Sequence, residues 1–137
     1  MLNCSDVRPV IPPNRRTILI CEDNTLISTG WAMILSDAGY AILGPVATGE
    51  LALEMALDQP PDLALVDIGL LGPIDGVSVA AELAELGVPV IYVTADYQRA
   101  SGDGREFAKD VLIKPVRQSA LLDSVAQVLR NSIPKSA

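Results

Sequence analysis

The chain has 137 residues, 50% of them hydrophobic, and a formal net charge of −7. This length favours one domain, and the acidity opposes binding to the phosphates of DNA or RNA. No membrane association is expected, because no apolar stretch approaches the ~18 residues that span a bilayer. We interpret the two cysteines, Cys4 and Cys21, as free thiols, which fits a cytoplasmic location.

Strand and helix patterns alternate along the chain. We expect a mobile leader over residues 1–15, one domain over 16–131 and a frayed tail over 132–137. The predicted strands are Thr17–Cys21, Ala41–Val46, Leu63–Val66, Val88–Thr94 and Val111–Ile113. The predicted helices are Thr25–Ala38, Thr48–Asp58, Val77–Leu86 and Gln118–Arg130. This alternation predicts an α/β fold with a parallel sheet and helices on both faces.

The segment 96–109 departs from this alternation. A helix is expected between the last two strands, yet Gly102 and Gly104 lie in the middle of the segment. Each glycine inside a helix costs roughly 1 kcal/mol relative to alanine. The sequence therefore predicts a fourth helix that is short, broken or mobile, with an ordinary loop as the alternative.

Polar side chains follow four of the predicted strands. Glu22 and Asp23 follow the first strand, Asp67 the third, Thr94 ends the fourth, and Lys114 follows the fifth. Ligands of open α/β sheets bind at the carboxyl ends of the strands, so we expect these side chains to converge. Three carboxylates, a hydroxyl and an ammonium suit a divalent cation beside a phosphoryl group.

Each of these residues also has a plainer interpretation. The acidic pair alone fits a solvated turn at a helix start, Asp67 a turn residue, and Thr94 a strand former. Because these residues occur together at the ends of four strands, they favour phosphoryl transfer as the function. A metal would neutralise charge, and Asp67 would be the nucleophile. Lys114 and Thr94 would then hold the phosphoryl oxygens.

In this order, the motifs resemble those of the receiver domain of two-component response regulators. The matching segments are Ile18–Asp23, Leu65–Asp67, Ile74–Gly76, Val93–Ala95 and Ile113–Pro115. The resemblance implies a flavodoxin-like (βα)5 fold, a doubly wound sandwich whose five-stranded parallel sheet has the order 2-1-3-4-5.

The same resemblance implies roles for the acidic residues. Asp67 would accept a phosphoryl group from a histidine kinase or a phosphotransfer protein. Mg²⁺ would be bound by Asp23, Asp67 and the backbone carbonyl of Gly69, and Glu22 would hold a metal-bound water. The protein would not be an enzyme beyond intrinsic autodephosphorylation.

By the same resemblance, Lys114 would pair with the phosphoryl group, and Thr94 would move toward it and report phosphorylation to a downstream protein. The chain departs from the family at Val111, where an aromatic residue is common, and at Val116, where phenylalanine is common. It also departs in the glycine-containing segment 96–109. We therefore hypothesise that phosphorylation orders or shifts this segment.

We expect a bacterial, stand-alone receiver, monomeric or weakly dimeric, because no output domain follows the last predicted helix. The alternatives are a relay or sink receiver detached from a hybrid kinase, which the pattern 69–76 also resembles, and a module that takes no phosphate. A haloacid-dehalogenase phosphatase is disfavoured, since its two acids lie two residues apart after the first strand. A flavodoxin is disfavoured, because the acidic pair repels a phosphate without a metal.

Overall fold

The computed structural model describes residues 15–70 and 72–132, so most of the predicted leader (1–15) and tail (132–137) lies outside the described residues. Five parallel strands form one sheet in the order β2-β1-β3-β4-β5. The strands are β1 (Thr17–Cys21), β2 (Ala41–Val46), β3 (Leu63–Asp67), β4 (Val90–Thr94) and β5 (Asp110–Ile113). This order confirms the predicted flavodoxin-like α/β fold.

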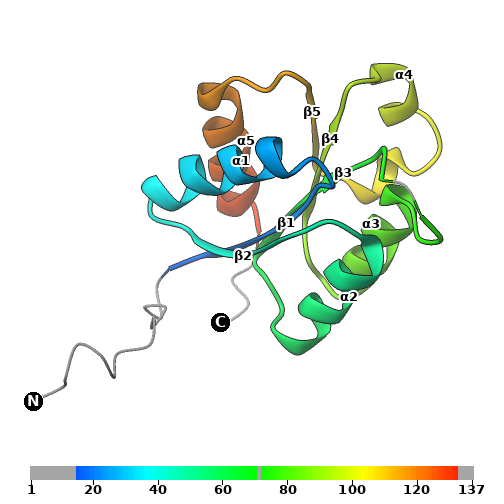
Figure 1. Ribbon diagram of the computed structural model, residues 1–137, viewed down its shortest axis with the longest axis horizontal. Helices are drawn as coiled ribbons and strands as arrows, with labels where there is room; N and C mark the ends of the chain where they lie inside the picture. Colours follow the sequence, from blue (N-terminus) through cyan, green and yellow to red (C-terminus); the bar gives the residue numbers. More distant parts are fainter. Residues whose placement is uncertain (1–14, 71, 133–137) are drawn as a thin grey trace, which may run out of the picture.

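Helices cover both faces of the sheet, with α1 and α5 on one face and α2 and α3 on the other (Figure 1). The helices are α1 (Thr25–Asp37), α2 (Gly49–Asp58), α3 (Gly76–Glu85), α4 (Tyr97–Ala100) and α5 (Gln118–Arg130), with a 3-10 turn, η2, at Arg105–Phe107. The side chains of Asn24, Thr48 and Asp75 cap the first turns of α1, α2 and α3. Among residues 15–70 and 72–132, no helix has the length and apolar composition needed to cross a membrane.

The central strands are buried on both faces, which is why they appear in the sequence as continuous apolar runs. In β1, Ile18 and Ile20 pack with Leu35 on the side of α1 and α5, whereas Leu19 and Cys21 pack on the side of α2 and α3. Each large aliphatic side chain contributes roughly 1.5–3 kcal/mol by leaving water. Burial also raises the pKa of the Cys21 thiol to about 12, so this thiol stays protonated.

Element boundaries differ from the prediction by a few residues. The fourth strand starts at Val90 and not at Val88. Pro89 has no N–H to donate to the sheet, and the Val88 N–H instead bonds the Leu83 carbonyl near the end of α3. Helix α3 and helix α1 each end one residue earlier than predicted.

The segment between β4 and β5 confirms the predicted short fourth helix. α4 is a single turn, and η2 follows after a bend that contains Gly104. The hydroxyl of the buried Tyr92 donates a hydrogen bond of 2.6 Å to the Gly104 carbonyl. Gly104 has a φ of +94°, and a Cβ there would overlap the Val77 side chain of α3. The loop is therefore tied both to the sheet and to α3.

Two glycines in helices, one closely packed and one with open space around it, provide a test of the packing between the helices and the sheet. A Cβ on Gly76, the first residue of α3, would overlap the backbone of Asp67 and Ile68. Gly76→Ala is expected to lower the free energy of unfolding, measured by urea denaturation, by about 2 kcal/mol. Gly30→Ala, in the middle of α1 with open space around it, should raise it by about 1 kcal/mol. Equal effects of the two substitutions would contradict the close contact between α3 and β3.

Candidate functional site

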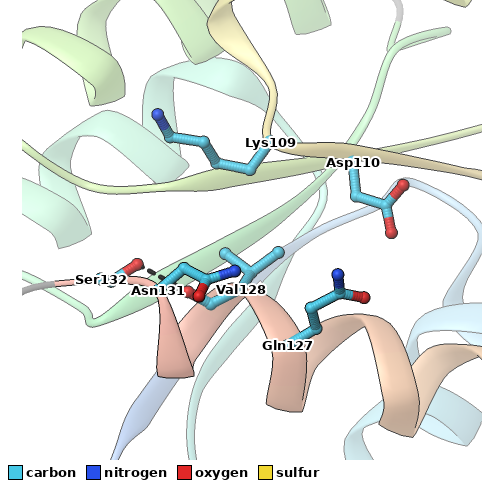
Figure 2. A pocket seen from close by; sticks show the side chains of 6 residues that line it. All are labelled: Lys109, Asp110, Gln127, Val128, Asn131 and Ser132. Carbon is cyan, nitrogen blue, oxygen red and sulfur yellow. Dashed lines mark hydrogen bonds between the residues drawn. The ribbon is translucent and has the colours of Figure 1, made fainter.

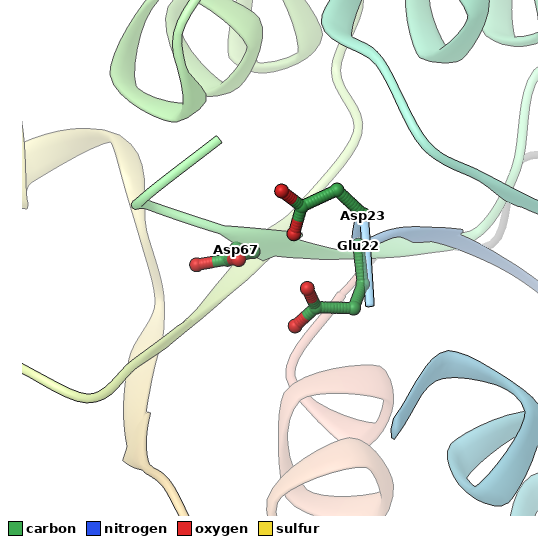
Figure 3. Close-up of side chains that lie close together, drawn as sticks. All are labelled: Glu22, Asp23 and Asp67. Atoms are coloured by element: carbon green, nitrogen blue, oxygen red, sulfur yellow. The ribbon is translucent and has the colours of Figure 1, made fainter. Parts of the chain in front are cut away.

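The carboxyl ends of β1 and β3 lie side by side, because Cys21 pairs with Val66 in the parallel register. The next residue along each strand is an acid, so Glu22 lies beside Asp67, and Asp23 follows. Glu22 is 2% exposed and Asp67 is 6% exposed, whereas Asp23 is open to solvent. One carboxylate oxygen of each acid lies within 4.8 Å of the others (Figure 3).

The ammonium of Lys114 reaches these carboxylates, although β4 separates β5 from β3. Its Nζ lies 2.5 Å from Glu22 Oε1 and 3.3 Å from Asp67 Oδ2. The Lys114–Pro115 peptide bond is cis. The ammonium also lies over the ring of Trp31 on α1, with 5.9 Å between Nζ and the ring centroid. The structure thus joins the predicted acids and the predicted lysine in one cluster.

The two oxygens of the Asp67 carboxylate have different partners. Oδ1 accepts a hydrogen bond of 2.8 Å from the Gly69 N–H, and Oδ2 faces the Lys114 ammonium. Partners on both oxygens restrain rotation of the carboxylate about its Cβ–Cγ bond. Asp67 is therefore held in one orientation at the end of a rigid, fully buried strand.

Thr94 lies at the same edge of the sheet, at the end of β4, and contacts the start of α4. Its hydroxyl accepts a hydrogen bond of 3.0 Å from the Asp96 N–H, and the Asp96 carbonyl is 3.3 Å away. The Asp96 carboxylate in turn accepts a hydrogen bond of 3.0 Å from the Gln98 N–H. The structure therefore connects Thr94 to the backbone of the segment that replaces an ordinary fourth helix.

Burial and charge act in opposite directions on the buried ion pair. Burial raises the pKa of Glu22 to about 7, while the Asn24 N–H, 3.0 Å from Oε2, and the Lys114 ammonium favour the ionised form. Burial alone would lower the pKa of Lys114, but the carboxylates of Glu22 and Asp67 outweigh it and hold that pKa above its usual value. The lysine therefore stays charged at neutral pH.

The donor set fits a hard divalent cation. Three carboxylates face one ammonium, so negative charge is in excess at a partly buried place where its repulsion is poorly screened. Magnesium prefers oxygen ligands and binds through one or two carboxylates together with water. The exposed carboxylate of Asp23 leaves a solvent-facing side on which such waters fit.

A cavity of about 310 Å³ lies at the opposite end of the strands, beside the start of β5 and the end of α5 (Figure 2). Its lining residues are Lys109, Asp110, Gln127, Val128, Asn131 and Ser132. Asp110 supplies the one carboxylate of this lining, and it accepts a hydrogen bond of 2.5 Å from the Ser124 hydroxyl. This cavity lacks the clustered acids that make the first site a candidate for phosphoryl chemistry.

Two residues of the site escaped the sequence analysis. Asn24 donates its N–H to Glu22, and its side chain caps α1 through the Ile27 N–H. A helix N-cap next to an acidic pair is a signal that sequence reasoning can use. Trp31 is 5% exposed, and its contact with Lys114 has no signal in the sequence.

A doubly wound parallel sheet with clustered acids and a lysine at its carboxyl edge is the arrangement of a receiver domain. The chain belongs to the response regulator receiver domain family, whose sequence model matches residues 18–126. Family membership confirms the resemblance inferred from the motifs, and it identifies this protein as a receiver homologous to two-component response regulators.

Known relatives and solved structures agree with this assignment. The chain is 34% identical over 116 residues to the transcriptional regulatory protein PdtaR of Mycobacterium tuberculosis, covering 80% of this chain and 55% of PdtaR. It therefore spans about half the length of that relative. The signal receiver domain of a modulated diguanylate cyclase from Desulfovibrio desulfuricans has a TM-score of 0.77 at 34% identity, covering 86% of this chain and 96% of that domain. A CheY-like receiver protein from Methanospirillum hungatei also has a TM-score of 0.77, at 28% identity, with the same coverage of 86% and 96%.

Mg²⁺ affinity is expected to fall as the pH falls through 7. At lower pH more of Glu22 is protonated, and the cation must displace that proton to gain the full negative charge of the site. Calorimetric titration with Mg²⁺ should give a Kd about tenfold higher at pH 6 than at pH 8. Glu22→Gln, which has no proton to lose, should remove most of this dependence. The same pH dependence in both proteins would contradict the assignment to Glu22.

Proposed function

We propose that Asp67 accepts a phosphoryl group from a histidine kinase or a histidine-containing phosphotransfer protein, with Mg²⁺ bound beside it. The observation that supports this proposal is that both oxygens of the nearly buried Asp67 carboxylate have a partner that holds them in place. The Gly69 N–H holds one oxygen at 2.8 Å, and the Lys114 ammonium lies 3.3 Å from the other. A nucleophile fixed in this way loses little freedom when it attacks phosphorus.

The proposed transfer forms a bond between an Asp67 carboxylate oxygen and phosphorus and breaks the bond between phosphorus and the donor histidine nitrogen. Bound Mg²⁺ would supply positive charge against the incoming phosphoryl oxygens. Asp23, Asp67 and the Gly69 carbonyl would ligate it, and Glu22 would hold one of its waters. Lys114 would move its ammonium from Glu22 to a phosphoryl oxygen, because phosphoryl transfer depends chiefly on positioning and charge.

Thr94 would connect phosphorylation to the rest of the protein. To bond a phosphoryl oxygen on Asp67, its hydroxyl has to leave the Asp96 backbone, which begins the loop that carries α4 and η2. The segment 96–109 would therefore shift on phosphorylation and change the surface offered to a downstream protein. In this proposal the receiver is a phosphoacceptor with at most intrinsic autodephosphorylation.

Incubation with acetyl phosphate and Mg²⁺ is expected to add one phosphoryl group to the wild-type protein, detected by intact mass. Asp67→Ala should gain none, because it lacks the acceptor oxygen. Asp58→Asn, at the exposed end of α2, is the matched control and should gain the same group as wild type. An adduct on Asp67→Ala would place the acceptor elsewhere. No adduct on wild type, together with no binding of beryllofluoride, would favour an interaction module that takes no phosphate.

Thr94→Ala is expected to accept the phosphoryl group but to lose the response of the segment 96–109. Hydrogen exchange of this segment should change when wild type binds beryllofluoride and Mg²⁺, and should stay constant in Thr94→Ala. Thr48→Ala, which removes the side-chain cap of α2 and leaves Thr94 and the segment 96–109 unchanged, should respond like wild type. An unchanged response in Thr94→Ala would show that another residue transmits the signal.

A further inference from the structure

Trp31 makes a contact with the site that packing alone does not require. Trp31 is 5% exposed and belongs to the apolar cluster on the side of α1 and α5. At the same time, its ring centroid lies 5.9 Å from the Nζ of Lys114, on a loop that follows the edge strand β5. An ammonium this close to an aromatic face is attracted by the negative potential of the ring.

The groups around Lys114 indicate what its contact with Trp31 does. The ammonium has the carboxylates of Glu22 and Asp67 as anionic partners. A groove with an apolar lining runs along the lysine, and its residues besides Lys114 and Trp31 are Leu26, Ile27, Gly30, Ile34, Pro115 and Val116. The Lys114 ammonium gains no attraction from aliphatic groups. The indole of Trp31 is therefore the part of the groove lining that attracts it.

We propose that Trp31 is a positioning residue, whose indole face holds the Lys114 ammonium at the site while it exchanges Glu22 for the phosphoryl group on Asp67. The inference rests on the proposed function. The close ion pair with Glu22 weakens as soon as the ammonium moves away from that carboxylate. The attraction to a ring face varies little over such a movement. Trp31 thus keeps the long, flexible side chain of Lys114 from turning into solvent while its ammonium moves from Glu22 to the phosphoryl group.

Substitutions that keep the packing but change the ring separate this role from a purely structural one. Trp31→Leu removes the aromatic face and should weaken the binding of beryllofluoride with Mg²⁺ about tenfold, measured by calorimetry. Trp31→Phe keeps a ring with a weaker attraction and should weaken it about threefold, and it is the variant to use if Trp31→Leu does not fold. Leu35→Ala, in the same apolar cluster, should lower stability and leave the affinity unchanged.

Fluorescence provides a second readout, because Trp31 is the one tryptophan of the chain. Binding of beryllofluoride and Mg²⁺ to wild type should change its emission as the ammonium moves across the ring. Lys114→Met, of similar length without charge, should show no change at ligand concentrations at which calorimetry detects its binding of beryllofluoride, and a wild-type-like change there would contradict the inference.

The outcomes are distinct. If wild type binds no beryllofluoride and accepts no phosphate, the proposed function fails and this inference fails with it. If wild type binds but both Trp31 variants bind equally well, the inference alone is overturned, and Trp31 is a core residue without a positioning role.

Discussion

The site depends on one ammonium held between two carboxylates. Lys114 joins the loop after β5 to the ends of β1 and β3, across the intervening strand β4. Two nearly buried acids next to each other would repel strongly without a cation, since the interior screens charge poorly. The parallel register that pairs Cys21 with Val66 creates this repulsion, and the lysine relieves part of it. The remaining negative charge makes the site receptive to a metal.

The loop between β4 and β5 shows how the fold compensates for a shortened helix. Phe107 and Ala108 pack against the cluster on the side of α2 and α3, where they bury apolar surface of the sheet. Tyr92 is fully buried in β4, and its hydrogen bond to the Gly104 carbonyl satisfies the hydroxyl there. The loop is thus anchored at its centre, while its start is attached to Thr94 at the site.

Features that depend on the residues of a single strand or helix were predictable from the sequence. The strands were predicted because burial on both faces produces apolar runs, and Glu22, Asp67 and Lys114 were placed together because each follows such a run. Contacts between distant elements were not predictable. The position of Trp31 against Lys114 depends on how α1 crosses the sheet, and the anchoring of Gly104 depends on which residue β4 directs toward it. The partner of the Thr94 hydroxyl depends on a local turn that no pattern encodes.

The close approach of Gly104 to Val77 also constrains how this receiver varies among its relatives. A side chain at position 104 would require both a smaller residue at position 77 and a backbone without the positive φ. A side chain gained first at position 104 would overlap Val77, and a smaller residue gained first at position 77 would leave a void beside Gly104. The two positions are therefore expected to covary in receivers that share this short fourth helix, and a relative with a full helix there is released from the constraint.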